Sequence, residues 1–265
     1  MTDQSAPNPS AILGSASHVV IGTTDRAAMV SFFEAFDFSV QAADAVSATM
    51  GRGLGHPTEL VLRDAAPGSR LTGYDLGPRG LDIYTTSMET SVERAVAEGG
   101  EPGPTATIDI GPFSMRQVTI WGPDDIPVVL IESPSRRTSL LDDNTDELHS
   151  QIHSVVWAVA DRDAEAAWWE RHGAARGVDL AFGSPDVATF MCLPDDTIDL
   201  EMVMLANDAN DPIRFELLKF VGHDGAEFAG GDLAGIQAVG FTVAGASTHR
   251  MMSPGGVVID VRSAG

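Results

Sequence analysis

One short phrase recurs four times along the chain, and this repetition constrains the fold more than any other feature of the sequence. Each copy is an apolar stretch that opens with a polar residue and ends at a small or acidic one. The copies begin at His18, Asp82, His153 and Gln237, in steps of 64, 71 and 84 residues. These steps are too long and too irregular for a solenoid. They fit a larger supersecondary unit that is present four times.

Helical periodicity follows the first three copies. After Asp25, a typical N-cap residue, the apolar side chains recur at helical spacing up to Phe36. Comparable patterns follow Glu89 and Asp161, and glycines at 99, 100 and 173 mark their ends. We therefore expect a helix after each of the first three strands. The segment 246–249 is too short for a helix, so the fourth unit is expected to be truncated.

A second phrase marks the end of each unit: a turn of Pro, Asp and Gly, an apolar run, and then a carboxylate. The closing carboxylates are Glu132, Glu216 and Asp260, whereas the first unit has Leu62 at the place we match to them. Proline, aspartate and glycine supply the dihedral angles that tight turns need. Each unit is therefore expected to continue from its helix into further strands.

A polar stretch without periodicity separates the second unit from the third. It runs from Ser133 to Leu148 and predicts a linker. We expect four segments: a disordered N-terminus at 1–15, a first domain at 16–134, a linker at 135–147 and a second domain at 148–265.

Composition excludes several classes of function. The formal net charge is −22, with no basic cluster beyond Arg136 and Arg137 in the linker, so nucleic acids and anionic lipid surfaces would repel the chain. We find no secretory signal pattern and no apolar run of the roughly 20 residues that a membrane helix needs. The single cysteine, Cys192, rules out an intrachain disulfide, and Lys219 is the one lysine available for Schiff-base chemistry. Neither a serine nucleophile elbow, a phosphate loop nor a dinucleotide fingerprint is present. We expect a cytoplasmic protein.

The opening and closing phrases resemble those of the vicinal-oxygen-chelate superfamily, which includes glyoxalase I, methylmalonyl-CoA epimerase, extradiol dioxygenases and bleomycin-resistance proteins. The resemblance covers roughly residues 16–262. It implies an α+β fold in which four βαβββ-type units, the fourth truncated, pair into two curled, open-barrel glyoxalase-like domains. It also implies that metal ligands come from the first and last strand of each paired unit and face one cup.

The resemblance leaves open which units pair, and the ligand set depends on the pairing. The first and second units would supply His18, Leu62, Asp82 and Glu132. The third and fourth units would supply His153, Glu216, Gln237 and Asp260, and the two middle units Asp82, Glu132, His153 and Glu216. Because His153 and Glu216 belong to both full sets, we assign the metal site to them first, followed by Asp82 and Glu132. Imidazole and carboxylate ligands suit Fe, Mn, Zn, Ni or Co.

The expected function is a metal-dependent isomerase, epimerase or lyase that acts on a small oxygenated metabolite. The metal would stabilise an enolate or oxyanion while a carboxylate moves a proton. One alternative is an extradiol ring-cleaving dioxygenase, which is weakened by Gln237 at the place of a second histidine and by the lack of tyrosine in 245–262. The other is a metal-free protein that binds or sequesters a small molecule, favoured by Leu62 and the short fourth unit. The expected partner is a small-molecule substrate, with no nucleic acid and no membrane, and the chain is compatible with a homodimer.

Some side chains are expected to be structural. The three tryptophans at 157, 168 and 169 are predicted to lie in the core or in the wall of an apolar pocket. We expect His149 and His223 at the surface, and Cys192 buried within a strand-like run.

Overall fold

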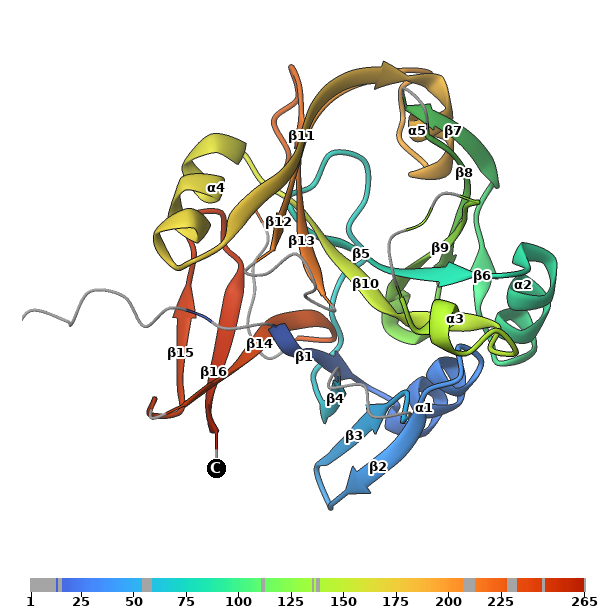
Figure 1. Cartoon of the computed structure of the whole chain (residues 1–265), viewed down its shortest axis with the longest axis vertical. Coiled ribbons are helices and arrows are strands. Elements are labelled where there is room, and N and C mark those ends of the chain that lie inside the picture. The colour runs from blue at the N-terminus through green and yellow to red at the C-terminus, as the bar shows by residue number, and fades with distance from the viewer. Residues whose placement is uncertain are drawn as a thin grey trace, which may run out of the picture.

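The computed structural model describes residues 13, 16–53, 59–110, 113–134, 136, 139–206, 213–227, 233–244 and 246–264 (Figure 1). The expected disordered segment, 1–15, lies outside the described residues apart from Leu13, which is buried.

Four units follow one another along the chain, as the repeated phrase predicts. The first contains β1 (Ala16–Thr23), α1 (Arg26–Glu34), β2 (Ser39–Ala43), β3 (Ser47–Gly51) and β4 (Glu59–Asp64). The second contains β5 (Gly77–Thr85), α2 (Met88–Ala97), β6 (Glu101–Pro102), β7 (Ala106–Ile110), β8 (Phe113–Trp121), the 3-10 turn η1 (Pro123–Asp125) and β9 (Pro127–Glu132). After the short helix α3 (Leu140–Asp143), the third contains β10 (His149–Ala158), α4 (Arg162–Arg171), β11 (Ala175–Ser184), α5 (Pro185–Phe190), β12 (Ile198–Ala206) and β13 (Arg214–Phe220). The fourth contains β14 (Gly235–Ala244), β15 (His249–Met252) and β16 (Val258–Ala264).

The first three units enter their helices through equivalent caps. Asp25, Ser87 and Asp161 each have extended backbone, and each side chain accepts a hydrogen bond from the backbone N–H three residues on. Such a cap satisfies one of the N–H groups that a helix start leaves without a partner. The helices predicted after the first three strands are confirmed. No helix follows β14 among the described residues of the fourth unit.

The strands form two sheets, and each sheet joins two units. The nine-stranded sheet unites the second and third units in the order β11-β12-β13-β10-β5-β9-β8-β6, with β7 attached to β8. The seven-stranded sheet unites the first and fourth units in the order β15-β16-β14-β1-β4-β3-β2. The units meet at two antiparallel contacts, β5 with β10 and β1 with β14. Of the three pairings that the sequence leaves open, the structure has the pairing of the middle units.

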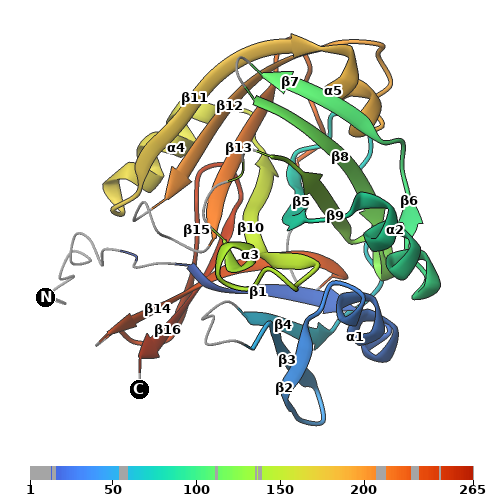
Figure 2. The ribbon, with the colours of Figure 1, turned by 45° about the vertical axis from the view of Figure 1, so that its right-hand side comes forward.

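Each sheet therefore takes one unit from each half of the chain. The ranges 16–134 and 148–265 describe halves of the sequence, and neither corresponds to a single sheet. The larger sheet is strongly curved, with β11 and β12 arching toward β7 and β8 (Figure 2). Its outermost strands on the main path, β11 and β6, do not pair with each other, so no closed barrel forms among the described residues. The predicted α+β fold of paired, curled units is confirmed.

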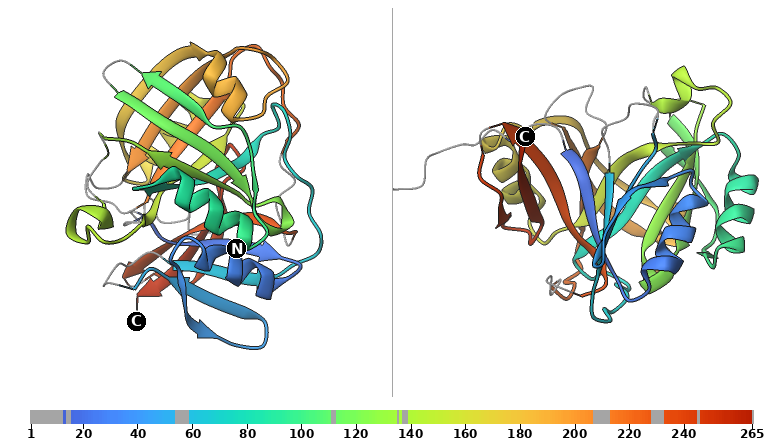
Figure 3. Two further views of the ribbon diagram at one scale, coloured as in Figure 1. Left: turned by 90° about the vertical axis from the view of Figure 1, so that its right-hand side faces the viewer. Right: turned by 90° about the horizontal axis from the view of Figure 1, so that it is seen from below.

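One continuous core connects the two sheets. It includes Phe32 and Phe33 from α1, Ile83 from β5, and Trp157 and Trp169 from the third unit, all at most 1% exposed. Helices α1 and α2 lie side by side (Figure 3), and Arg94 of α2 donates to the Glu34 carbonyl of α1 at 3.3 Å. None of the helices in the described part of the chain is long and apolar enough to span a membrane.

Two predictions about individual side chains were wrong. His149 is fully buried, because β10 starts beneath the junction of the first and second units. There its Nδ1 lies 2.8 Å from an Asp37 carboxylate oxygen and its Nε2 lies 2.8 Å from the Ser91 hydroxyl. Cys192 is exposed, since it follows α5 in a turn with a φ of 54° and does not belong to a strand.

Candidate functional site

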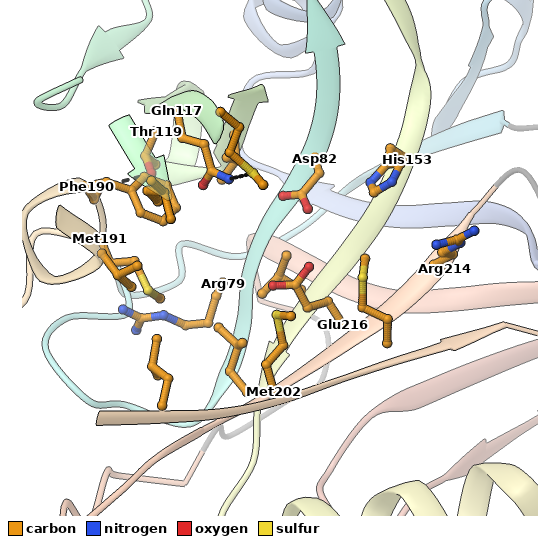
Figure 4. Close-up of a pocket in the computed structure, with 18 of the residues that line it drawn as sticks. Arg79, Asp82, Gln117, Thr119, His153, Phe190, Met191, Met202, Arg214 and Glu216 are labelled. Carbon is orange, nitrogen blue, oxygen red and sulfur yellow. Dashed lines mark hydrogen bonds between the residues drawn. The ribbon is translucent and has the colours of Figure 1, made fainter. Parts of the chain in front are cut away.

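The nine-stranded sheet holds a cavity of about 240 Å³ that is lined by the second and third units. Its walls come from β5, β7, β8 and β9 on one side and from β10, α5, β11, β12 and β13 on the other (Figure 4). Most of the lining is apolar, and four methionines belong to it: Met115, Met191, Met202 and Met204. Methionine is unbranched and polarisable, so such a wall can adapt to apolar ligands of different shapes.

The cavity brings together three of the four predicted site residues. Asp82 comes from β5, His153 from β10 and Glu216 from β13, although they are far apart in the sequence. In Figure 4 the carboxyl groups of Asp82 and Glu216 point into the same part of the cavity. The pairing of the middle units produces this arrangement, because β10 is hydrogen-bonded to both β5 and β13.

Burial dominates the electrostatics of the two carboxyl groups. It raises the pKa of Asp82 well above its usual range, and the nearby charge of Glu216 raises that pKa further, against a hydrogen bond from Ser154. Burial also raises the pKa of Glu216 to about 7. The Ser154 hydroxyl lies 2.6 Å from His153 Nδ1, so Ser154 connects Asp82 to the histidine. Burial therefore favours the protonated forms of both carboxyl groups in the site.

Glu132 is not part of the cavity, and this expectation must be corrected. Side chains alternate across a strand, so Val129 of β9 lines the cavity while Glu132, three residues on, points to the opposite face. There Glu132 accepts a hydrogen bond from Arg116 at 2.6 Å and another from the Met88 backbone N–H at 3.2 Å. It thus sits at the start of α2, where a negative charge is favourable.

Counting back from the helix caps shows which residues of the two paired units correspond. His153 lies eight residues before the cap Asp161, and Arg79 lies eight residues before the cap Ser87. Strand register gives the same match. In the second unit Arg79 lies three residues before Asp82, which pairs with Val129. In the third unit His153 lies three residues before Val156, which pairs with Glu216. The corresponding set is thus Arg79, Val129, His153 and Glu216.

This set does not fit a resident divalent metal. Two of its four members are Arg79 and Val129, and neither a guanidinium nor an isopropyl group ligates a metal ion. The described residues contain no group of three or more His, Cys, Asp or Glu side chains positioned to hold an ion. The predicted shell of His153, Glu216, Asp82 and Glu132 is therefore not assembled.

In the seven-stranded sheet, the polar residues that the sequence offered as alternative ligands have partners within the protein. His18 Nε2 lies 3.4 Å from Asp260 Oδ2, and Arg63 and Arg262 approach the same oxygen at 3.6 and 3.5 Å. The hydrogen bond with His18, together with the two arginines, lowers the pKa of Asp260 despite burial. Gln237 donates to the Leu233 carbonyl at 2.9 Å. These contacts give His18, Gln237 and Asp260 a structural role.

Several polar residues that line the cavity were not predicted from the sequence. Tyr84 and Arg214 lie two residues from Asp82 and Glu216 and share their strand faces, so period-two alternation was the available signal. Counting back from Ser87 would have found Arg79. Gln117 of β8 carried no comparable signal.

No protein-family model matches the sequence, and no curated protein matches it. Solved structures do resemble the fold. A single-substitution variant of glyoxalase I from Zea mays aligns with a TM-score of 0.64 at 14% identity, covering 93% of this chain and 91% of that one. A putative dioxygenase from Bacillus subtilis aligns with a TM-score of 0.61 at 9% identity, covering 95% and 85%. At such identities the likeness concerns the fold alone. The chain shares the fold of these two solved structures over nearly its whole length.

Proposed function

We propose that this protein is an enzyme that binds a small, largely apolar, oxygenated molecule in the cavity and moves a proton within it, as an isomerase, epimerase or lyase does. The observation that carries the proposal is that Glu216, a half-buried carboxyl group with a pKa of about 7, faces an apolar cavity beside Asp82. A general base works best when its pKa lies near the working pH.

The two carboxyl groups suit different parts of a proton transfer. Glu216, when ionised, can remove a proton from carbon next to a carbonyl group. Asp82, whose protonated form is favoured by burial and by Glu216, can donate a hydrogen bond to the oxygen on which negative charge develops. Pairs of carboxyl groups whose environments separate their protonation states often divide acid and base roles in this way. The apolar walls would exclude water from the reacting atoms.

This proton transfer does not require a metal ion, and the donor set of the cavity does not fit one. The ring-cleaving dioxygenase alternative depends on such a set and gains no support from the cavity. The metal-free binding or sequestering alternative remains the second candidate. It is favoured by the methionine-rich lining and by Val129 at the place that corresponds to Glu216.

Proton exchange with solvent tests the proposal without knowledge of the natural substrate. Acetophenone, ethyl acetoacetate and phenylpyruvate would be incubated with the protein in D₂O, and loss of the α-proton signal would be followed by NMR. Wild-type protein should accelerate exchange for at least one compound, and Glu216→Gln should slow that exchange by about 100-fold or more.

The matched control is Glu201→Gln. Glu201 lies on β12 between two cavity residues but faces away from the cavity, where it pairs with Lys219 at 3.3 Å. This variant should exchange protons as fast as wild type. Binding of these compounds without any accelerated exchange would favour the sequestering alternative instead.

A further inference from the structure

Arg79 is a cation that the wall of the cavity holds in a fixed orientation. Its guanidinium donates to the Gly73 carbonyl at 3.0 Å and to the Asp75 carbonyl at 3.4 Å, both in the loop before β5. A guanidinium has five N–H donors, and the described part of the chain accounts for these two. The loop therefore orients Arg79 and leaves donors that can meet a ligand.

The charge of Arg79 is only weakly compensated. Burial lowers its pKa to about 10, and the carboxylate that acts against this change is that of Asp75. At neutral pH the guanidinium stays protonated, and an anion brought next to it would relieve part of the cost of its burial.

On the cavity side, apolar side chains lie beside Arg79. Figure 4 places the guanidinium beside Met191 and near Phe190, on the opposite side of the cavity from His153 and Arg214. The Phe220 ring lies 5.5 Å away in cation–π contact. A ligand that reaches Arg79 must therefore combine an anionic group with an apolar body. Arg79 also stands where the paired unit has His153, so a fixed positive charge occupies a place that the resemblance assigns to a metal ligand.

We propose that the cavity binds carboxylates with an apolar body, the carboxylate pairing with the Arg79 guanidinium and the body packing on the methionine-rich wall, without a divalent metal. A planar carboxylate matches the two parallel N–H groups of a guanidinium. This inference deepens the proposed function by naming the class of ligand and shares its cavity, but it does not require proton transfer.

Matched pairs of acids and amides test the inference. Benzoate, 3-phenylpropanoate, 2-naphthoate and octanoate would each be compared with the corresponding neutral amide by isothermal titration calorimetry. For wild type we expect at least one carboxylate to bind tenfold or more tightly than its amide. Arg79→Gln should remove this preference while leaving amide binding within about twofold, and Arg79→Lys should keep part of it.

Arg176→Gln is the matched control, because Arg176 of β11 pairs with Glu170 and Asp179 outside the cavity. It should keep the full preference. If Arg79→Gln only damaged the loop at 73–75, carboxylate and amide would lose affinity equally, and the inference would be overturned. Equal affinity of every acid and its amide for wild type, or no binding of any acid, would overturn it too.

Titrations with Zn²⁺ and Mn²⁺ alone show whether carboxylate binding depends on a metal ion or on the Arg79 guanidinium. We expect neither ion to bind the wild type tightly, and carboxylate affinity to be unchanged after treatment with a chelator. Loss of carboxylate binding on chelation, restored by either ion, would contradict the inference. Carboxylate preference without proton exchange would refute only the proposed function, and exchange without carboxylate preference would refute only the inference.

Discussion

Arg79 and His153 occupy the same position in two paired units: each lies eight residues before the cap of its helix, and both line one cavity. The backbone positions correspond in the two units, but the chemistry of their side chains differs. In one unit the position holds an imidazole, and in the other a guanidinium that cannot ligate a metal ion. The site is therefore asymmetric, and its asymmetry suits recognition of an anion on one side and proton transfer on the other.

Glu216 should make the protein less stable as the pH rises. Its folded-state pKa of about 7 lies above the usual value of 4.5, so its contribution is fully present below pH 4.5 and is lost as pH rises through 7. Glu216→Gln removes this loss. At pH 8.5 we expect the free energy of unfolding of the variant to exceed that of wild type by on the order of 3 kcal/mol, so the variant should unfold at a higher urea concentration. At pH 4.5 the two proteins should unfold at similar urea concentrations.

Urea unfolding of both proteins at the two pH values measures the effect. Glu201→Gln serves as the control and should show no pH-dependent gain. A Glu216→Gln variant that is less stable than wild type at pH 8.5 would mean that the carboxylate is stabilised there by a partner.

Glu165 should contribute to the contact between the two sheets. It is fully buried on α4, and it accepts hydrogen bonds from Trp169 Nε1 at 2.8 Å and from the Gly255 backbone N–H at 2.6 Å in the fourth unit. In Glu165→Gln one acceptor oxygen becomes an NH₂ group, which leaves a buried donor without a partner. We expect a loss of about 1–3 kcal/mol in the free energy of unfolding. Glu165→Ala should lose more, and equal stability of Glu165→Gln and wild type would contradict this role.

The sequence predicted the units well and their pairing not at all. Helix caps such as Asp25 and Asp161 and the glycines after the helices are local signals, so the first three helices could be placed from sequence. The pairing of units depends on which two opening strands lie next to each other in a sheet. The strands β1, β5 and β10 are all apolar enough to be buried, so composition does not distinguish them. Nothing local distinguishes the contact of β5 with β10 from the alternatives.

The sequence predicted the candidate site only in part. His153 and Glu216 stand at matching places in a strand opening and a strand closing, and the phrases located both. In the second unit, the last carboxylate of the closing phrase, Glu132, was taken as the ligand. Alternation along β9 gives Val129 the place that corresponds to Glu216. Similarly, Asp82 was taken as the opening residue although Arg79 corresponds to His153.

Asp37 should stabilise the junction of the first two units at neutral pH. Burial opposes its ionisation, but hydrogen bonds and charges from His149 and Arg94 hold its pKa well below the usual range. Stability gained from such a group is present above about pH 4 and is lost as the pH falls through the folded-state value. Asp37→Asn should therefore cost about 1–3 kcal/mol at pH 7. The difference from wild type should shrink as the solution becomes strongly acidic.

Asparagine suits this test because Asp37 has a φ of 63°, a conformation that asparagine tolerates. Thermal unfolding at pH 7 and pH 3 measures the difference, with Glu98→Gln on the exposed end of α2 as the control. A constant difference at both pH values would show that the side-chain shape, and not the charge, stabilises the junction.

A metal site should be created by two substitutions at the places where the paired units differ. Arg79→His together with Val129→Glu would give the second unit the imidazole and carboxylate that the third unit has in His153 and Glu216. The four donors would then come from corresponding positions on β5, β9, β10 and β13, which face one cavity. We expect the double variant to bind Zn²⁺ or Mn²⁺ in calorimetry at least 100-fold more tightly than wild type. Either single substitution should give a much smaller gain, because it leaves the set with three donors.

Stability supplies a second measurement on the same variants. Without metal, Val129→Glu places another carboxyl group among buried apolar side chains, so the double variant should melt at a lower temperature than wild type. Added Zn²⁺ should raise its melting temperature, since a ligand that binds only the folded state stabilises that state. Wild type should not respond. A folded double variant that neither binds nor is stabilised by either ion would show that the matching of Arg79 with His153 and of Val129 with Glu216 does not describe ligand geometry.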